Sequence, residues 1–147
     1  MLLWRINRHP DLSGEGGLRA SGRWYDRGIH VVYLAETPAG ALLESCVHTC
    51  SNNIPPTYTL LAIAVPDDIS IEALYVAIQP PDWVDQPEQT RRAGTEWLRS
   101  SRPALLRVPS ALVPATFNVI LNPLHPDAKG LRIEARYGYP FDPRLKR

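Results

Sequence analysis

Proline constrains this chain more than any other residue type, since 15 of its 147 residues are proline. A proline ring fixes φ and removes the backbone N–H donor, so it interrupts helices and central strands. Many of the prolines stand where apolar segments end, at 55–56, 66, 80–81, 109, 123 and 126. Short elements joined by irregular connections fit this spacing, and a long helical bundle does not.

The composition is that of an ordinary globular protein. Apolar residues make up 44% and charged residues 21%, and the length suits one domain with a real core. The formal net charge of +1 gives no support to direct nucleic-acid binding. No apolar run approaches the roughly 18 residues of a membrane span, and the N-terminus lacks a signal-peptide pattern. We therefore expect a cytoplasmic protein without membrane contact.

Hydrophobic patterning predicts several short strands and two helices. The helices are expected at 36–48, with Thr37 as N-cap and Pro38 in the first turn, and at 87–101. Segments 11–23 and 66–86 are expected to be irregular. Because strands and helices do not alternate as β-α-β units, the predicted fold class is α+β. The strands are expected at 1–6, 30–35, 57–65, 104–108, 115–121 and 130–137.

The glycine-rich segment at 11–23 is not a dinucleotide fingerprint, because the third glycine position of G-x-G-x-x-G falls on Arg19. Its last residue, Arg23, follows a glycine that would let backbone approach a ligand closely. A guanidinium matches a phosphate with two parallel donors, so Arg23 is a candidate phosphate ligand. The alternative is a loop arginine packed on Trp24 or Tyr25.

Two residues stand out in or beside apolar segments. Tyr33 lies in an apolar strand, where a phenol either belongs to the core or stacks on a planar ligand ring. Glu44 lies on the predicted helix and shares a face with small or weakly polar residues. Its carboxylate either sits in a concavity on that face or is solvated.

Three polar residues near the C-terminal strands are further candidates. Ser110 lies outside any G-x-S-x-G elbow, so contact with a ligand or capping of a turn is favoured over a serine hydrolase. Strand periodicity turns Asn118, Ile120 and Asn122 the same way. Buried amides need partners, so Asn118 and Asn122 either bind a ligand or tie down the loop at 123–126.

A metal site is a separate hypothesis, because His48 lies between Cys46 and Cys50. Structural zinc generally takes four ligands, and the helical spacing turns His48 away from the two thiols. We therefore expect two reduced cysteines and no metal.

Taken in order, these segments resemble the RES-domain family, the toxin half of RES–Xre toxin–antitoxin pairs. The name-giving Arg, Glu and Ser of the family match Arg23, Glu44 and Ser110. The resemblance covers nearly the whole chain, so we expect a single RES domain over residues 1–147. It rests on six segments, at 3–6, 16–24, 31–35, 41–44, 108–111 and 122–126.

The resemblance implies an ADP-ribosyltransferase-like fold, with a split mixed or antiparallel β core and flanking helices. It implies NAD as substrate, with Arg23 on the phosphates, Tyr33 stacked on the nicotinamide and Glu44 at the ribose. Arg23, Tyr33 and Glu44 would form the catalytic trio, and Ser110 would help to shape the NAD pocket. The amides Asn118 and Asn122 are weaker candidates for the same pocket.

The chemistry suits these residue types. Cleavage of the nicotinamide–ribose bond builds positive charge on the ribose, which a nearby carboxylate stabilises more in the transition state than in the ground state. Attack by water gives NAD glycohydrolysis, attack by phosphate gives phosphorolysis, and attack by a protein side chain gives ADP-ribosylation. The sequence favours NAD degradation, because no segment stands out as a docking platform for a protein.

The resemblance also implies a partner, an antitoxin with an Xre-like helix-turn-helix DNA-binding region. DNA contact would then belong to the partner. A non-catalytic module that keeps the fold only for partner contact is the main alternative, and it predicts damage at the catalytic trio, which is intact.

Overall fold

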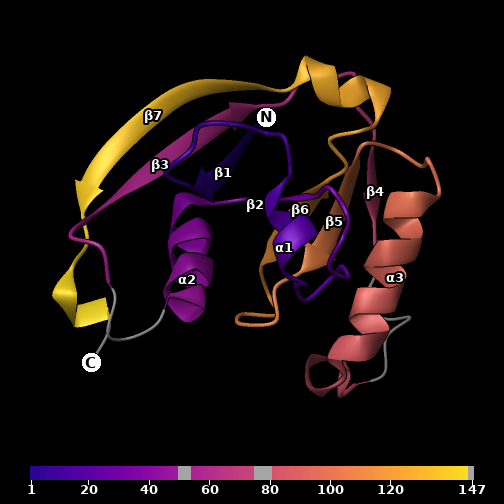
Figure 1. Ribbon diagram of the computed structural model, residues 1–147, viewed down its shortest axis with the longest axis horizontal. Helices are drawn as coiled ribbons and strands as arrows, with labels where there is room; N and C mark the ends of the chain where they lie inside the picture. The colour runs from indigo at the N-terminus through magenta and orange to yellow at the C-terminus, as the bar shows by residue number, and fades with distance from the viewer. Residues whose placement is uncertain (50–53, 75–80, 146–147) are drawn as a thin grey trace.

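The computed structural model describes residues 1–49, 54–74 and 81–145. Within these residues, seven strands form one sheet in the order β4-β5-β6-β2-β1-β3-β7 (Figure 1). The sheet is mixed, because β4 and β5 are parallel while the other described pairs are antiparallel. The strands are β1 (Leu2–Ile6), β2 (Val32–Ala35), β3 (Thr57–Ala64), β4 (Ile71–Ala73), β5 (Leu105–Pro109), β6 (Phe117–Leu121) and β7 (Arg132–Pro140).

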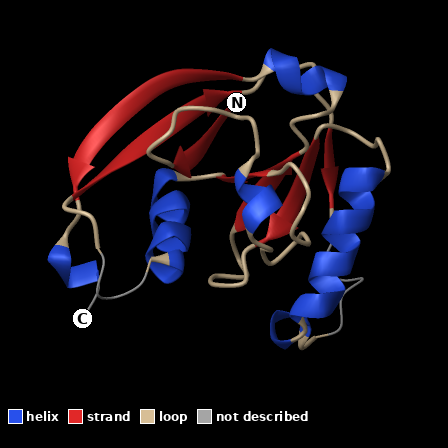
Figure 2. Cartoon of the chain, in the orientation of Figure 1, coloured by secondary structure: helices blue, strands red, loops and turns tan. Residues whose placement is uncertain are grey.

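Two longer helices flank the sheet and follow from local sequence signals. The Oγ1 of Thr37 accepts a hydrogen bond from the Gly40 amide at 2.9 Å, which caps α2 (Pro38–His48). In Figure 1, α2 lies beneath β1 and β3, and α3 (Pro87–Arg99) stands beside β4. Shorter turns complete the chain, α1 (Gly16–Arg19), η2 (Trp83–Asp85), η3 (Pro126–Gly130) and η4 (Pro143–Leu145) (Figure 2).

The sheet is split between its two central strands. Strands β1 and β2 share a single residue pair, Trp4 with Ala35. By contrast, β1 pairs with β3 over five positions and β2 with β6 over four. The sheet therefore divides into one half built from β1, β3 and β7 and another built from β2, β6, β5 and β4.

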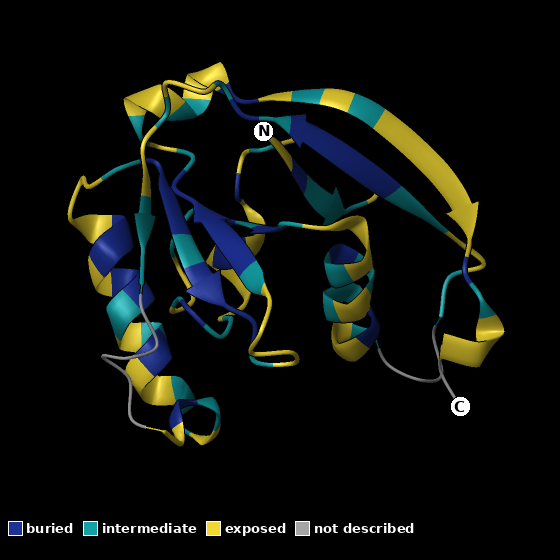
Figure 3. Cartoon of the chain, turned by 180° about the vertical axis from the view of Figure 1, so that it is seen from behind, coloured by how far each residue is buried: buried dark blue, intermediate teal, exposed yellow. Residues whose placement is uncertain are grey.

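Buried side chains hold both halves together. One cluster centres on Leu3, Leu34 and Leu61, and a second packs α3 on the sheet through Trp97 and Ile120. Figure 3 shows β3, β5 and β6 largely buried, whereas most of β7 is exposed. The site described below lies between these buried regions.

Most element predictions are confirmed. The α+β class, the split mixed sheet, both helices and all six predicted strands are present, with ends that differ by a few residues. The prediction that 11–23 is wholly irregular is wrong, because it contains α1. A four-residue helix is too short to show a 3.6-residue period, and this one forms where Gly17 packs against the Ile29 carbonyl.

The prediction for 66–86 is wrong in the same way where the structure describes it, since that segment contains β4 and η2. Strand β4 has only three residues and forms by pairing with β5, more than thirty residues away. Such a strand depends on tertiary pairing, which a local pattern does not reveal. In the described ranges, no helix is long and apolar enough to cross a membrane.

Candidate active site

Glu44 stands at the centre of a hydrogen-bonded group that joins three elements. Its Oε1 accepts from Asn118 Nδ2 at 2.7 Å and from Ser110 Oγ at 3.1 Å. Asn118 lies on β6 and Ser110 follows β5, and both are buried. Glu44 itself is half-buried on α2, so its carboxylate is fixed from one side and open on the other.

Tyr33 joins this group through the same amide. The Nδ2 of Asn118 also donates to the Tyr33 hydroxyl, at 3.1 Å. Burial raises the pKa of Tyr33 first, and the neighbouring Glu44 carboxylate raises it further. The phenol therefore stays neutral at physiological pH, and the Asn118 amide bridges Tyr33 and Glu44.

A cavity of about 230 Å³ opens in front of Glu44 and Tyr33. It lies where β1 and β2 diverge, and α2 closes one side of it. Most of the wall is apolar and a few polar groups converge on it, which is typical of small-molecule sites. The lining residues of β1 and β2 are Trp4, Arg5, Ile6, Tyr33, Leu34 and Ala35, and those of α2 and its end are Ala41, Glu44, Ser45, His48 and Thr49.

Arg5 is a functional candidate that the sequence analysis missed. It lines the Glu44 cavity and also a second, polar cavity of about 380 Å³ bordered by His9 and Arg19. Burial lowers the pKa of the Arg5 guanidinium, although the nearby Asp11 and Tyr25 partly offset this. The sequence could have indicated Arg5 as the one charged residue in the apolar strand Leu2–Ile6. Its position where β1 and β2 separate depends on the tertiary fold.

Arg23 is not one of the residues that line the cavity. Its Nη1 donates to the Val84 carbonyl at 2.7 Å. This bond uses one of the five N–H donors of the guanidinium. Its charge lowers the pKa of Tyr33, so the guanidinium lies within electrostatic range of the phenol. Tyr25, which the sequence analysis named only as a packing partner of Arg23, raises the pKa of Tyr33.

Asn122 is placed apart from the Glu44 group. Its Nδ2 donates to the Leu98 carbonyl at 3.2 Å, and its Oδ1 accepts from the Leu124 amide at 3.1 Å. These bonds agree with the alternative that Asn122 holds the loop at 123–126 in place. Asn118, by contrast, lies within the candidate site. A ligand contact for Asn122 stays a prediction.

The structure describes two of the three residues of the hypothetical metal site, Cys46 and His48. Cys46 is buried, His48 is exposed at the cavity rim, and Cys50 lies outside the described residues. Across the described ranges, no group of three or more His, Cys, Asp or Glu side chains could hold a metal ion.

A family model described as the RES domain matches residues 2–142 of the chain. The chain belongs to the RES-domain family. A protein named Toxin Res from Pseudomonas putida is 47% identical to this RES domain over 91% of the chain and 92% of the relative. A Sphingobium protein named Prs ADP-ribosylating toxin is 39% identical over 97% of the chain and 91% of the relative.

A solved structure shares the fold of this RES domain. The Mycobacterium tuberculosis MbcT–MbcA toxin–antitoxin complex contains a chain that superposes with a TM-score of 0.65. The match covers 99% of the RES domain and 86% of the other chain, at 20% sequence identity. At that identity the likeness concerns the arrangement of the backbone alone.

Proposed function

We propose that this RES domain is the toxin of a toxin–antitoxin pair and that it cleaves NAD at the nicotinamide–ribose bond. The observation that carries the proposal is the half-buried Glu44 carboxylate, held by Asn118 and Ser110 and facing a cavity beside the neutral phenol of Tyr33. The names of the two relatives, both of which include the word toxin, support the biological role.

The cavity suits the nicotinamide end of the dinucleotide. It is too small for the whole of NAD, so the remaining parts would extend beyond it. In this proposal Tyr33 stacks on the nicotinamide ring, and Arg23 and Arg5 bind the two phosphates. Arg5 suits this role because it borders both cavities, so a ligand passing from one to the other would meet its guanidinium.

The proposed chemistry uses the charge of Glu44. As the glycosidic bond breaks, neutral nicotinamide leaves with the bonding electrons and the ribose becomes oxocarbenium-like. A fixed carboxylate stabilises this charge and can also orient or deprotonate the attacking nucleophile. Asn118 and Ser110 hold Glu44 in place, so the carboxylate does not have to reorganise during the reaction.

We favour water or phosphate as the nucleophile, which degrades NAD. Transfer of ADP-ribose to a protein is the second candidate, and the name of the Sphingobium relative supports it. A non-catalytic binding module is the third. The assembled group of Glu44, Tyr33, Ser110 and Asn118 argues against it, because a surface used only for partner contact has no need of such a site.

We further propose an antitoxin partner with an Xre-like helix-turn-helix region that blocks the NAD cavity. The fold of the MbcT–MbcA complex, which contains a toxin and its antitoxin, supports the pairing. A structure of the pair with an open cavity would argue against blocking.

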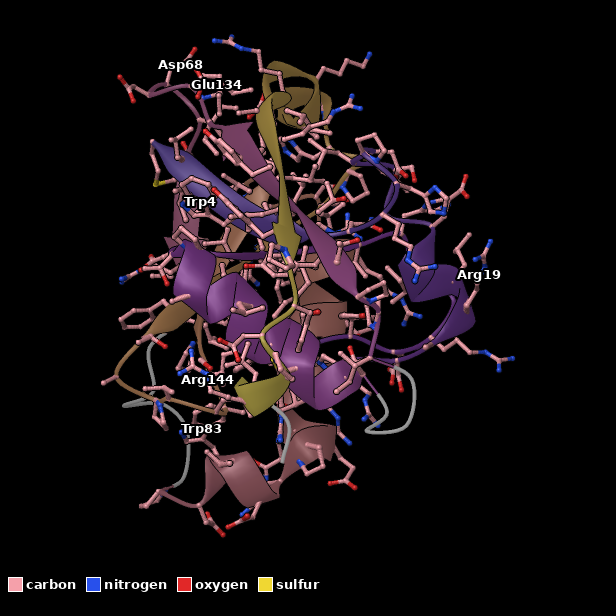
Figure 4. The ribbon with its side chains drawn as sticks, turned by 90° about the vertical axis from the view of Figure 1, so that its left-hand side faces the viewer. Trp4, Arg19, Asp68, Trp83, Glu134 and Arg144 are labelled. Atoms are coloured by element: carbon pink, nitrogen blue, oxygen red, sulfur yellow. The ribbon has the colours of Figure 1, made fainter. Side chains whose placement is uncertain are left out.

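Glu44→Gln tests the activity, because it keeps the shape of the side chain and removes its charge. We expect nicotinamide release from NAD to fall about 10²- to 10³-fold. Glu134→Gln is the control, since Glu134 is exposed on β7 away from α2 (Figure 4).

The products separate the three acceptors. ADP-ribose indicates water, ADP-ribose 1″-phosphate formed only with added phosphate indicates phosphorolysis, and a modified protein indicates transfer. In cells, wild type should deplete NAD and stop growth, and Glu44→Ala should do neither. If NAD stays intact under all of these conditions, the proposed activity is wrong.

A further inference from the structure

The segment at 22–26 lies against helix α3. It carries Arg23, which lowers the pKa of Tyr33, and Tyr25, which raises it. The segment and α3 are more than sixty residues apart in the sequence. The position of the Arg23 backbone therefore depends on its contacts with α3.

Three side chains of α3 bind backbone groups of the segment. The Oγ1 of Thr90 donates to the Arg23 carbonyl at 2.7 Å, and Arg91 Nε donates to the Gly22 carbonyl at 3.2 Å. One turn later, the Oγ1 of Thr95 accepts from the Asp26 amide at 2.9 Å. The segment is thus held at its start, its middle and its end.

Close packing reinforces these bonds. A Cβ added at Gly94 would come within 1.8 Å of the Trp24 carbonyl oxygen, so α3 and the segment touch without an intervening side chain. The Trp24 indole is fully buried and lies 5.8 Å from the Trp83 ring, centroid to centroid. The Trp24 backbone therefore has little room to shift relative to α3.

Thr90 differs from the other two anchors because it acts at Arg23 itself. It has no exposed surface, and its hydroxyl reaches both the Arg23 carbonyl and the Pro87 carbonyl in its own helix, at 3.0 Å. A helical threonine usually bonds only back along its own helix. The guanidinium of Arg23 is held in turn by Val84, just before α3, so this region fixes both ends of Arg23.

We propose that Thr90 is a positioning residue that sets how Arg23 faces the substrate. The inference rests on the proposed function, because it assumes that Arg23 binds the phosphates of NAD. Thr90 itself touches no substrate. Its loss weakens substrate binding while the reacting groups around Glu44 stay in place.

The test compares Thr90→Val, which keeps the shape and removes the hydroxyl, with Thr90→Ser, which keeps the hydroxyl. We expect the KM for NAD to rise about three- to tenfold in Thr90→Val, as for one lost hydrogen bond, with kcat within about twofold of wild type. Thr90→Ser should restore the KM. Ser100→Ala is the control, since the Ser100 hydroxyl, at the C-terminal end of α3, donates to the Trp97 carbonyl and not to the segment at 22–26.

A merely structural role would lower the melting temperature without separating KM from kcat. An unchanged KM in Thr90→Val, or a fall in kcat alone, overturns the inference. If Thr90→Val does not fold, Thr90→Ala replaces it, because it removes the same hydroxyl with a smaller side chain. Thr90→Ala should also raise the KM, and an unchanged KM in that variant likewise overturns the inference.

Hydrogen exchange separates this inference from the proposed function. Amides of residues 22–26 should exchange faster in Thr90→Val than in wild type or Thr90→Ser, whether or not NAD is a substrate. If wild type does not consume NAD but exchange rises, the proposed function fails and the anchoring role stands. Unchanged exchange overturns the anchoring role.

Discussion

Asn118→Asp is the change that most directly tests the arrangement around Glu44. It replaces an amide that donates to Glu44 at 2.7 Å and to Tyr33 at 3.1 Å with a carboxylate of the same shape. Loss of the bond to the charged Glu44 costs about 2 kcal/mol, and loss of the bond to the Tyr33 hydroxyl costs about 1 kcal/mol. Two carboxylates about 4 Å apart would add up to about 4 kcal/mol at an effective dielectric constant near 20, so the pair should instead take up a proton.

The loss of folding stability in Asn118→Asp should therefore depend on pH. In the folded variant the shared proton has a pKa above that of an isolated carboxyl group, so the native state binds more protons than the unfolded state. The resulting stability is present below the ordinary carboxyl pKa near 4 and is lost as pH rises through the folded pKa. At pH 5 the protonated carboxyl group can again donate to Glu44, so the free energy of unfolding should fall by only about 1–2 kcal/mol. At pH 8 both bonds are lost and the two carboxylates repel, so it should fall by about 4 kcal/mol or more.

Chemical denaturation at the two pH values measures this difference, and nicotinamide release at neutral pH should fall about 10²-fold. Asn118→Leu is the matched control, since it removes the same two bonds without adding a carboxylate. It should be destabilised by a similar amount at both pH values. If both variants respond to pH alike, or Asn118→Asp is fully active, the arrangement inferred for Glu44 is wrong.

Two further predictions concern Tyr33 and Arg5. The raised pKa of Tyr33 adds stability that is present below the ordinary tyrosine pKa near 10 and is lost as pH rises towards the folded pKa. Wild type should thus lose stability faster than Tyr33→Phe above pH 10 in denaturation experiments, and parallel curves would contradict the burial of the phenol. Arg5→Gln should raise the KM for NAD about tenfold or more, as for loss of a charge-assisted bond, whereas Arg8→Gln on the neighbouring exposed residue should not. Equal KM values for the two variants would remove Arg5 from the substrate site.

Local signals predicted the longer elements well. The threonine cap and the proline after it set the start of α2, and the apolar run at 57–65 formed β3. The short elements α1 and β4 were missed because each depends on contacts from distant segments. Propensity over three or four residues does not outweigh such contacts.

The candidate site was predictable in its parts but not in its connections. Glu44 and Tyr33 were singled out as residue types that are unusual in their segments, and the structure brings them together. That one amide of Asn118 joins them could not be read from strand periodicity, which treated Asn118 and Asn122 alike. Arg5 was not predicted as a site residue. It lines the cavity only because β1 and β2 separate after Trp4, and the sequence of β1 alone does not show that separation.

The sheet order has a consequence for how the chain reaches this structure during synthesis. The half that begins with β1 is completed by β7, more than 120 residues later in the chain. Until residues 132–140 have left the ribosome, one edge of β3 lacks its neighbour, although every residue of the Glu44 group has already been made. Unpaired edges and distant pairings slow folding and favour aggregation. We therefore infer that β3 keeps an unpaired edge in the nascent chain until β7 has been made, after the residues of the Glu44 group.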